Sequence, residues 1–333
     1  MICEFLTGSY ASPEEEGICR FCLDTERGKL EKLWGVRGLR NPSWILLDKR
    51  RDILYAVRET VPEGAVAAFR MEPEGIRLLN ELESGGADPC HLSLADKGRL
   101  LLAANYTGGS LAAFSLKEDG SLEKRVRLAA HHGAGPDPVR QEAAHVHFSE
   151  ERDGILYVTD LGQDRVFRYH PDERLAEADE PLSLPPGSGP RHLAFRDDML
   201  YVLCELAGET AVFRRTEKGY ALCQRLSMLP SGFSGKNIAS AIRISGDFLL
   251  TGNRGHDSLA LCRIGEDGEL SLLDIVPCGG KTPRDFALMG DYVLTADQDS
   301  DCLSVLRLDR KRGRLEDTGI RAGTARPSCI CPV

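Results

Sequence analysis

The sequence predicts an all-β fold, a seven-bladed β-propeller whose ring is closed by N- and C-terminal strands that share one blade. Three observations predict it. A strand-rich unit recurs with a period of roughly 45–55 residues, close to the range of propeller blades. Short apolar or alternating runs bounded by Gly, Asp, Asn and Pro dominate, and amphipathic helical patterns are few. The two chain ends carry complementary parts of one unit.

Each unit opens with an apolar strand that follows a turn residue. These first strands begin at Pro42, Pro89, Ala144, Pro190, Ala239, Pro283 and Pro327. A second strand follows and ends in a polar group, and a third, amphipathic strand comes next, as in 109–114 and 301–306. Glycine turns such as the one at Gly120 then lead into fourth strands.

The two chain ends explain how the ring closes. The first strand at Pro327 has almost nothing after it, whereas residues 4–10 look like a second strand whose first strand is missing. Together they complete one blade, which gives seven blades and protects the sheet edges at both ends of the chain. Because no linker interrupts the repeat, we expect residues 1–333 to form a single domain.

The composition of the chain limits which partners and which cellular compartment we expect. A formal net charge of -9 argues against nucleic acid or an anionic membrane as a partner. The eleven cysteines, an odd number, fall largely within strand patterns, which indicates reduced thiols. Cys19 and Cys22 have a CxxC spacing, but on a strand they would point to opposite faces, which disfavours a metal or redox role. No membrane-spanning or signal-peptide pattern is visible, so we expect a cytoplasmic protein.

Blade topology brings two sets of polar residues to one mouth of the ring. Successive strands alternate in direction, so the loop entering strand one and the loop after strand two lie at the same end. The entering set is His91, His145, His147, Arg191, His192, Arg284 and Asp285. The second-strand ends carry Asn105, Tyr106, Asp160, Glu205, Asn253, Arg254, Asp297 and Gln298. Each residue alone is as well explained as a strand cap, but convergent polar groups in a concavity predict a site.

Three of these residues, Arg191, Arg254 and Arg284, suit an anionic ligand, because guanidinium binds carboxylate or phosphate in bidentate fashion. The longest irregular stretch, 131–143, lies nearby between two blades, and long loops in compact domains are often functional. Its first histidine, His131, is expected to be solvated.

Histidines supply candidate proton-transfer groups. His145 or His147, with Glu205, could perform general acid–base catalysis, and the sequence leaves open which of them is the base. A His-x-His on a strand would place both rings on one face, which is also compatible with a metal site. No third ligand stands close by in sequence, so we predict no metal.

Five stretches of the chain resemble one family. They are 135–147, 160–166, 187–195, 253–258 and 296–301. Together they are similar to the seven-bladed propeller lactonases, which include the propeller-type 6-phosphogluconolactonases. The fungal carboxy-muconate lactonizing enzymes belong to the same fold family.

The resemblance implies a cofactor-independent lactonase, a carboxylic ester hydrolase that opens a small anionic lactone. The substrate it implies is 6-phosphogluconolactone, hydrolysed to 6-phosphogluconate in the pentose phosphate pathway. It implies the catalytic residues His145, His147, Glu205, Arg191 and Arg254. From the same mouth we predict the substrate-binding residues Arg284, His192, His91, Asn105 and Gln298.

Two alternatives stay open. The same arginines could bind the carboxylates of a muconolactone, and Cys204, which stands where the family has Asn, puts the fine placement of substrate in question. A non-catalytic propeller that binds proteins would show aromatics on its rim, but the chain is only 6% aromatic. The sequence does not indicate an oligomeric state.

Overall fold

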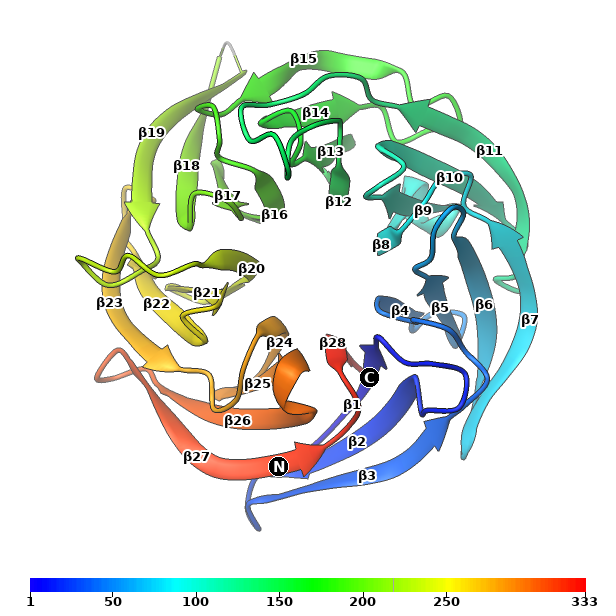
Figure 1. Cartoon of the computed structure of the whole chain (residues 1–333), viewed down its shortest axis with the longest axis horizontal. Coiled ribbons are helices and arrows are strands. Elements are labelled where there is room, and N and C mark those ends of the chain that lie inside the picture. The colour runs from blue at the N-terminus through cyan, green and yellow to red at the C-terminus, as the bar shows by residue number, and fades with distance from the viewer. Residues whose placement is uncertain (218) are drawn as a thin grey trace.

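Seven four-stranded antiparallel sheets surround a central channel in the computed structural model of the chain, which describes residues 1–217 and 219–333 (Figure 1). The predicted fold class, a seven-bladed β-propeller, is confirmed. Blades 1 to 6 are each continuous in sequence and run from the innermost strand outward.

The strands of blades 1 to 3 succeed one another along the chain. Blade 1 is β4 (Ile45–Asp48), β5 (Ile53–Arg58), β6 (Ala65–Glu72) and β7 (Gly75–Glu83). Blade 2 is β8 (Pro89–Ala95), β9 (Leu100–Asn105), β10 (Ser110–Leu116) and β11 (Leu122–Ala130). Blade 3 is β12 (Val146–Arg152), β13 (Ile155–Asp160), β14 (Arg165–Tyr169) and β15 (Glu177–Ser183).

Blades 4 to 6 repeat this order. Blade 4 is β16 (Pro190–Arg196), β17 (Met199–Cys204), β18 (Glu209–Thr216) and β19 (Gly219–Ser227). Blade 5 is β20 (Ile238–Ser245), β21 (Phe248–Arg254), β22 (Ser258–Ile264) and β23 (Leu270–Pro277). Blade 6 is β24 (Pro283–Met289), β25 (Tyr292–Asp297), β26 (Cys302–Asp309) and β27 (Arg314–Gly323). Two short 3-10 helices, η1 (Asp96–Gly98) and η2 (Gln298–Ser300), follow β8 and β25.

Blade 7 closes the ring with both chain ends, as predicted. Its strands, from the channel outward, are β28 (Pro327–Pro332), β1 (Ile2–Ser9), β2 (Ile18–Asp24) and β3 (Lys29–Val36). The C-terminal β28 pairs antiparallel with β1, so Leu6 faces Cys331 and Thr7 faces Ile330. The strands β28 and β1 therefore lie side by side in Figure 1, and the innermost edge of the last blade is occupied.

Strand position within a blade decides burial. The second strand β9 is buried over all its residues because the neighbouring blades cover both of its faces. The fourth strands β7 and β19 are mostly exposed or half-buried along the rim. The core is accordingly shared between pairs of blades, as where β5 and β9 contribute to one cluster.

The first strands carry a recurrent irregularity that points side chains into the mouth. In β8, Pro89 pairs with Asn105 but His91 already pairs with Ala104, which leaves Cys90 without a ladder partner. The same one-residue shift occurs at the second residue of β12, β16 and β24, namely His147, Arg191 and Arg284. Such bulges bend the strand and re-aim a side chain.

Candidate active site

A cavity of about 380 Å³ lies at the mouth where the first strands begin. We call it the mouth cavity. Its lining residues are Glu59, Asp88, Cys90, Tyr106, Thr107, Arg140, His147, Glu205, Ile238, Arg254 and Arg284. Three of them, Cys90, His147 and Arg284, are bulge residues of first strands, so the irregular start of each strand supplies the site. Glu205 and Arg254 come from the ends of second strands, as the sequence predicted.

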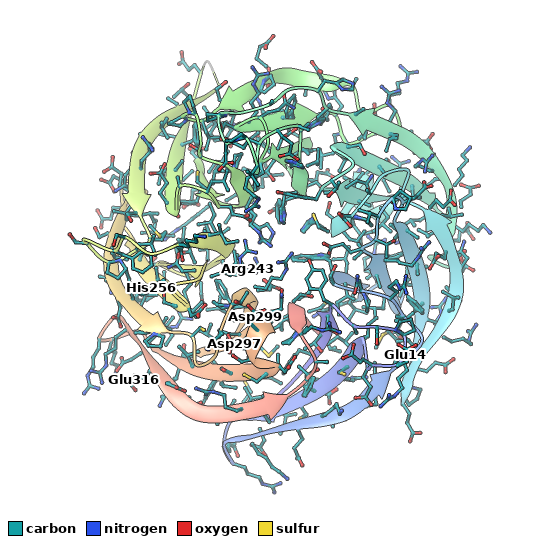
Figure 2. The ribbon with its side chains drawn as sticks, viewed as in Figure 1. Glu14, Arg243, His256, Asp297, Asp299 and Glu316 are labelled. Atoms are coloured by element: carbon teal, nitrogen blue, oxygen red, sulfur yellow. The ribbon has the colours of Figure 1, made fainter. Side chains whose placement is uncertain are left out.

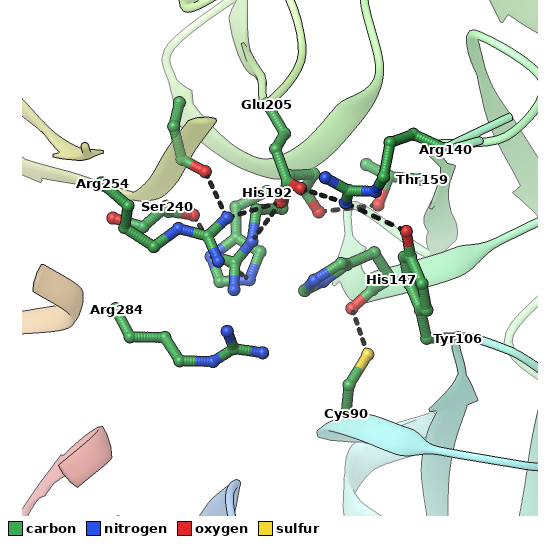
Figure 3. A network of polar contacts seen from close by, with 12 residues as sticks. Cys90, Tyr106, Arg140, His147, Thr159, His192, Glu205, Ser240, Arg254 and Arg284 are labelled. Carbon is green, nitrogen blue, oxygen red and sulfur yellow. Dashed lines mark hydrogen bonds and ion pairs between the residues drawn. The ribbon is translucent and has the colours of Figure 1, made fainter. Parts of the chain in front are cut away.

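Glu205 is the centre of a charged network (Figure 3). Its Oε2 lies 3.0 Å from Arg191 Nε and 2.7 Å from Arg254 Nη2. Its Oε1 accepts a hydrogen bond from Arg140 Nη2. The side chains of Glu205 and Arg191 are each only 3% exposed, whereas that of Arg140 is 33% exposed. One buried carboxylate therefore organises three guanidinium groups from three different segments.

These neighbours set the ionisation of the network. Burial acts to raise the pKa of Glu205, but Arg254, Arg191 and Arg140 outweigh it and lower that pKa to about 2. Burial, reinforced by the charge of Arg254, lowers the pKa of Arg191 to about 9. Glu205 is thus ionised and Arg191 protonated at neutral pH, and the network carries net positive charge.

Arg284 stands apart from this network in Figure 3. Its Nη2 donates to Tyr10 Oη, and its Cζ lies 4.7 Å from the centre of the Tyr10 ring. Tyr10 Oη in turn donates to Glu59 Oε1 at 2.8 Å. Among residues 1–217 and 219–333, no carboxylate lies within 4.0 Å of the Arg284 guanidinium.

The two histidines of the His-x-His have different surroundings. His147 lines the mouth cavity, and burial, then Arg191 and Arg284, lower its pKa well below the ordinary value, so its imidazole is neutral. His145 precedes β12 and its ring stacks on Tyr106 at 4.5 Å, with Nε2 3.2 Å from Glu142 Oε1. The strand starts later than predicted because Asp160 Oδ1 accepts from the His145 N–H. His145 therefore supports Tyr106 from behind and does not line the cavity.

His91 and His192 belong to a layer beneath the cavity. The rings of Trp44, His91, Phe148 and His192 contact one another with centroids 4.2–5.9 Å apart. Arg191 Nη1 donates to His192 Nε2 at 3.0 Å, which couples this layer to the Glu205 network. Neither histidine lines the mouth cavity. Each directly follows a bulge residue in its strand, and His91 lines the cavity of the channel instead.

A larger cavity of about 600 Å³ lies in the channel, beyond the layer of aromatic and imidazole side chains just described. All seven first strands line it. Its polar residues include Arg243, whose side chain reaches toward the centre of the ring in Figure 2. Arg243 Nη2 lies 2.8 Å from Asp285 Oδ1, and Asp285 is fully buried. Asp285 therefore anchors the channel wall and is not part of the mouth.

Asn105 and Gln298, both predicted to bind substrate, do not line the mouth cavity. Asn105 is fully buried and its Nδ2 donates to Ser110 Oγ at 3.1 Å, so it braces its own blade. Gln298 lies in η2, and its Nε2 donates to Asp299 Oδ1 at 3.3 Å. Both residues lie at or directly after the end of a second strand, as predicted, but their side chains form hydrogen bonds within the local turns.

Sequence reasoning missed Arg140, Tyr10 and Glu59 as site residues. Arg140 lies in the loop 131–143, whose length was the available signal. Gln141 fixes this loop, because its Nε2 donates to Leu161 O at 2.9 Å and to Asp164 Oδ1 at 2.8 Å. No local pattern marks Tyr10 and Glu59, which meet Arg284 only after ring closure.

The expectation that His131 is solvated was wrong. Its side chain is 2% exposed, with Nδ1 2.8 Å from Asp160 Oδ2 and Nε2 2.8 Å from Tyr169 Oη. The loop is therefore anchored at its first residue as well as at Gln141. This double anchorage gives Arg140 a defined position over Glu205.

Within the described part of the chain, no group of three or more His, Cys, Asp or Glu side chains is arranged to hold a metal ion. All eleven cysteines are free thiols. Among residues 1–217 and 219–333, no helix has the length and apolar character that a membrane crossing requires.

Fold and site together define a class: a seven-bladed propeller with a buried, arginine-rich site at one mouth of its channel. The profile of the family described as "Lactonase, 7-bladed beta-propeller" matches residues 4–332, so the chain belongs to this family. It is a lactonase, a carboxylic ester hydrolase.

Individual relatives agree with this assignment. The 6-phosphogluconolactonase of Bacillus subtilis (strain 168) is 32% identical, over 97% of this chain and 96% of the relative. The periplasmic gluconolactonase of Pseudomonas aeruginosa is 30% identical with a TM-score of 0.93, covering 100% of this chain and 99% of that one. A Lactobacillus plantarum protein superposes with a TM-score of 0.93 at 27% identity and 100% coverage of both chains.

Proposed function

We propose that the protein hydrolyses 6-phosphogluconolactone to 6-phosphogluconate. The observation that carries the proposal is a single cavity in which a cationic network faces a neutral imidazole. Arginine guanidinium suits both the phosphate of such a substrate and the oxyanion formed during ring opening. The Bacillus subtilis relative, named for this activity, supports the choice of substrate.

We assign the proton transfer to His147. In hydrolysis, the oxygen of a water molecule attacks the lactone carbonyl carbon and its proton passes to the neutral imidazole. The ring C–O bond then breaks, and the leaving oxygen takes up a proton to give the hydroxy acid. Glu205 is a poor base here, because its pKa is about 2 and its oxygens already accept from arginines.

Arg254 is suited to stabilise the oxyanion that forms at the carbonyl. It lines the mouth cavity, and its Nη2 is held by Glu205, whose Oε2 lies 2.7 Å away. A donor fixed before the reaction needs no reorganisation as charge develops. In this scheme Glu205 positions Arg191, Arg254 and Arg140, and it does not transfer a proton.

The test is the rate of 6-phosphogluconolactone opening above the uncatalysed background, with wild type, Arg254→Ala and Arg191→Ala compared. We expect a strong acceleration that is lost in both variants. Arg77→Ala, which removes a surface guanidinium paired with Glu72, is the matched control and should retain wild-type rates. No acceleration by wild type would refute the proposed substrate.

A lactone that bears carboxylates, of the muconolactone type, is the second candidate, because guanidinium forks bind carboxylate as well as phosphate. Comparing wild-type kcat/KM on phosphorylated and carboxylated lactones separates the two. We further propose that the enzyme acts in the pentose phosphate pathway, as the proposed substrate implies, and that it is cytoplasmic, which its eleven free thiols support. The absence of cofactor, nucleic-acid and membrane partners stays a prediction.

A further inference from the structure

The arginines that line the mouth cavity differ in how their charge is balanced. Arg254 and Arg140 each bind Glu205 directly. Arg284 reaches a carboxylate only through a hydroxyl group: its Nη2 donates to Tyr10 Oη, and Tyr10 donates to Glu59. No other hydrogen bond of the Arg284 side chain is found among the described residues.

An intervening hydroxyl has a physical consequence. A carboxylate in direct contact with guanidinium occupies up to two N–H groups and cancels the charge. A tyrosine hydroxyl occupies one N–H and is neutral, so most of the guanidinium fork is left for a ligand. The Tyr10 ring also lies against Arg284, with Cζ 4.7 Å from the centroid, which fixes the plane of the guanidinium.

Glu59 holds the tyrosine in place. Its Oε1 accepts from Tyr10 Oη at 2.8 Å and its Oε2 accepts from Ser43 Oγ, so the carboxylate is held from both sides. Because the single hydroxyl proton of Tyr10 is donated to Glu59, the Tyr10 oxygen can only accept a hydrogen bond from Arg284. The direction of both hydrogen bonds is therefore set by Glu59.

We propose that Arg284 binds the anionic group of the substrate, with Tyr10 and Glu59 as positioning residues, and that this makes the enzyme selective for anionic over uncharged lactones. The inference rests on the proposed function and deepens it. Arg284 and His147 face each other across the space between them in Figure 3. The substrate then lies with its anionic end at Arg284 and its carbonyl at His147 and Arg254.

The partners of the guanidinium groups support this orientation. The three guanidinium groups on the Arg254 side already have Glu205 as a carboxylate partner, and their remaining N–H groups suit a developing oxyanion. Arg284 lacks a directly bound carboxylate and suits a full negative charge on the substrate. A phosphate and a carboxylate share this chemistry, so the inference concerns anionic lactones as a class.

The test is the selectivity ratio, kcat/KM for 6-phosphogluconolactone divided by kcat/KM for glucono-1,5-lactone, in wild type and Tyr10→Phe. Phenylalanine keeps the ring against Arg284 but lets Glu59 approach the guanidinium directly. We expect the ratio to fall about tenfold or more, with the loss in KM for the phosphorylated lactone. An unchanged ratio would overturn the proposal.

A matched control separates positioning from stability. Tyr55 is also a buried tyrosine whose hydroxyl donates one hydrogen bond, to Gly120 O at 2.8 Å, and neither residue lines the mouth cavity. Tyr55→Phe should destabilise the fold about as much as Tyr10→Phe and leave the ratio as in wild type. If both variants lowered the ratio equally, Tyr10 would have a merely structural role and the proposal would fail.

A binding experiment distinguishes this proposal from the proposed function. If wild type opened neither lactone, the proposed function would fail, and calorimetric titration with inorganic phosphate would decide the role of Arg284. Phosphate binding that weakens about tenfold in Tyr10→Phe, but not in Tyr55→Phe, supports an anion site at Arg284. Equal binding by wild type and Tyr10→Phe, or none by wild type, overturns it.

Discussion

Arg254 Nη2 lies 2.7 Å from Glu205 Oε2, and the two side chains are only 7% and 3% exposed. Desolvation of both charges is expensive, and the contacts of the carboxylate with Arg254, Arg191 and Arg140 together offset it for Glu205. The carboxylate is thus the shared counter-charge of the site. Its removal would leave three guanidinium groups facing one another.

We predict that Glu205→Gln destabilises the protein by about 3–5 kcal/mol, since it leaves buried charges without compensation. Urea unfolding of wild type and variant measures the difference. Glu72→Gln, at a half-exposed carboxylate paired with Arg77, should have little effect. A loss below about 1 kcal/mol in Glu205→Gln would show that the arginines find other partners or lose their charge.

The lowered pKa of Glu205 predicts that the stability of the protein depends on pH. The pKa of Glu205 falls from its ordinary value of 4.5 to about 2 in the folded protein. A carboxyl group with a depressed folded pKa contributes stability above its unfolded pKa, and this contribution is lost as pH falls toward the folded pKa. The shift corresponds to a contribution on the order of 3 kcal/mol. Between pH 4.5 and about pH 2, the unfolding free energy of wild type should therefore drop more steeply than that of Glu205→Gln. Parallel curves for the two proteins would contradict the lowered pKa of Glu205.

His147 leads to a kinetic prediction. Because burial and nearby arginines keep its imidazole neutral, kcat should be flat from about pH 6 to about pH 8, without an acid limb from this group. His147→Gln should lower kcat roughly 10²–10⁴-fold if His147 accepts the proton. His145 stacks on Tyr106 but does not itself line the cavity, so His145→Gln should change kcat much less. The reverse order of effects would transfer the role to His145.

The fold was predictable because the repeat is visible in the sequence and the two chain ends complement each other. The positions of Arg191, Glu205 and Arg254 followed from blade topology alone. Tyr10 and Glu59 did not, because Tyr10 and Arg284 are 274 residues apart and meet only when the ring closes.

Asn105 illustrates a different failure. It was assigned to the site by its strand-end position, yet its Nδ2 donates to Ser110 Oγ. Asn253 makes the equivalent contact with Ser258 Oγ at 3.3 Å in another blade. The Asn-x4-Ser spacing recurs in the sequence and marks a brace of the turn between second and third strands. Position in a blade predicts which end a residue lies at, but the side-chain direction depends on bulges and turn contacts that have weaker sequence signals.

The loop that carries Arg140 depends on a close backbone approach at Gly162. A Cβ at this position would lie 1.8 Å from Ala143 O and 3.0 Å from the His145 nitrogen, so Gly162→Ala must displace the end of the loop. We predict a stability loss of about 1–3 kcal/mol together with a fall in kcat/KM, because Arg140 shifts relative to Glu205. Gly75→Ala is the matched control, since nothing lies within 4 Å of its Cβ. Urea unfolding and lactone-opening rates of the two variants provide the comparison. If Gly162→Ala lost stability but kept wild-type kcat/KM, the position of Arg140 would not matter for catalysis, and the network around Glu205 would need only Arg191 and Arg254.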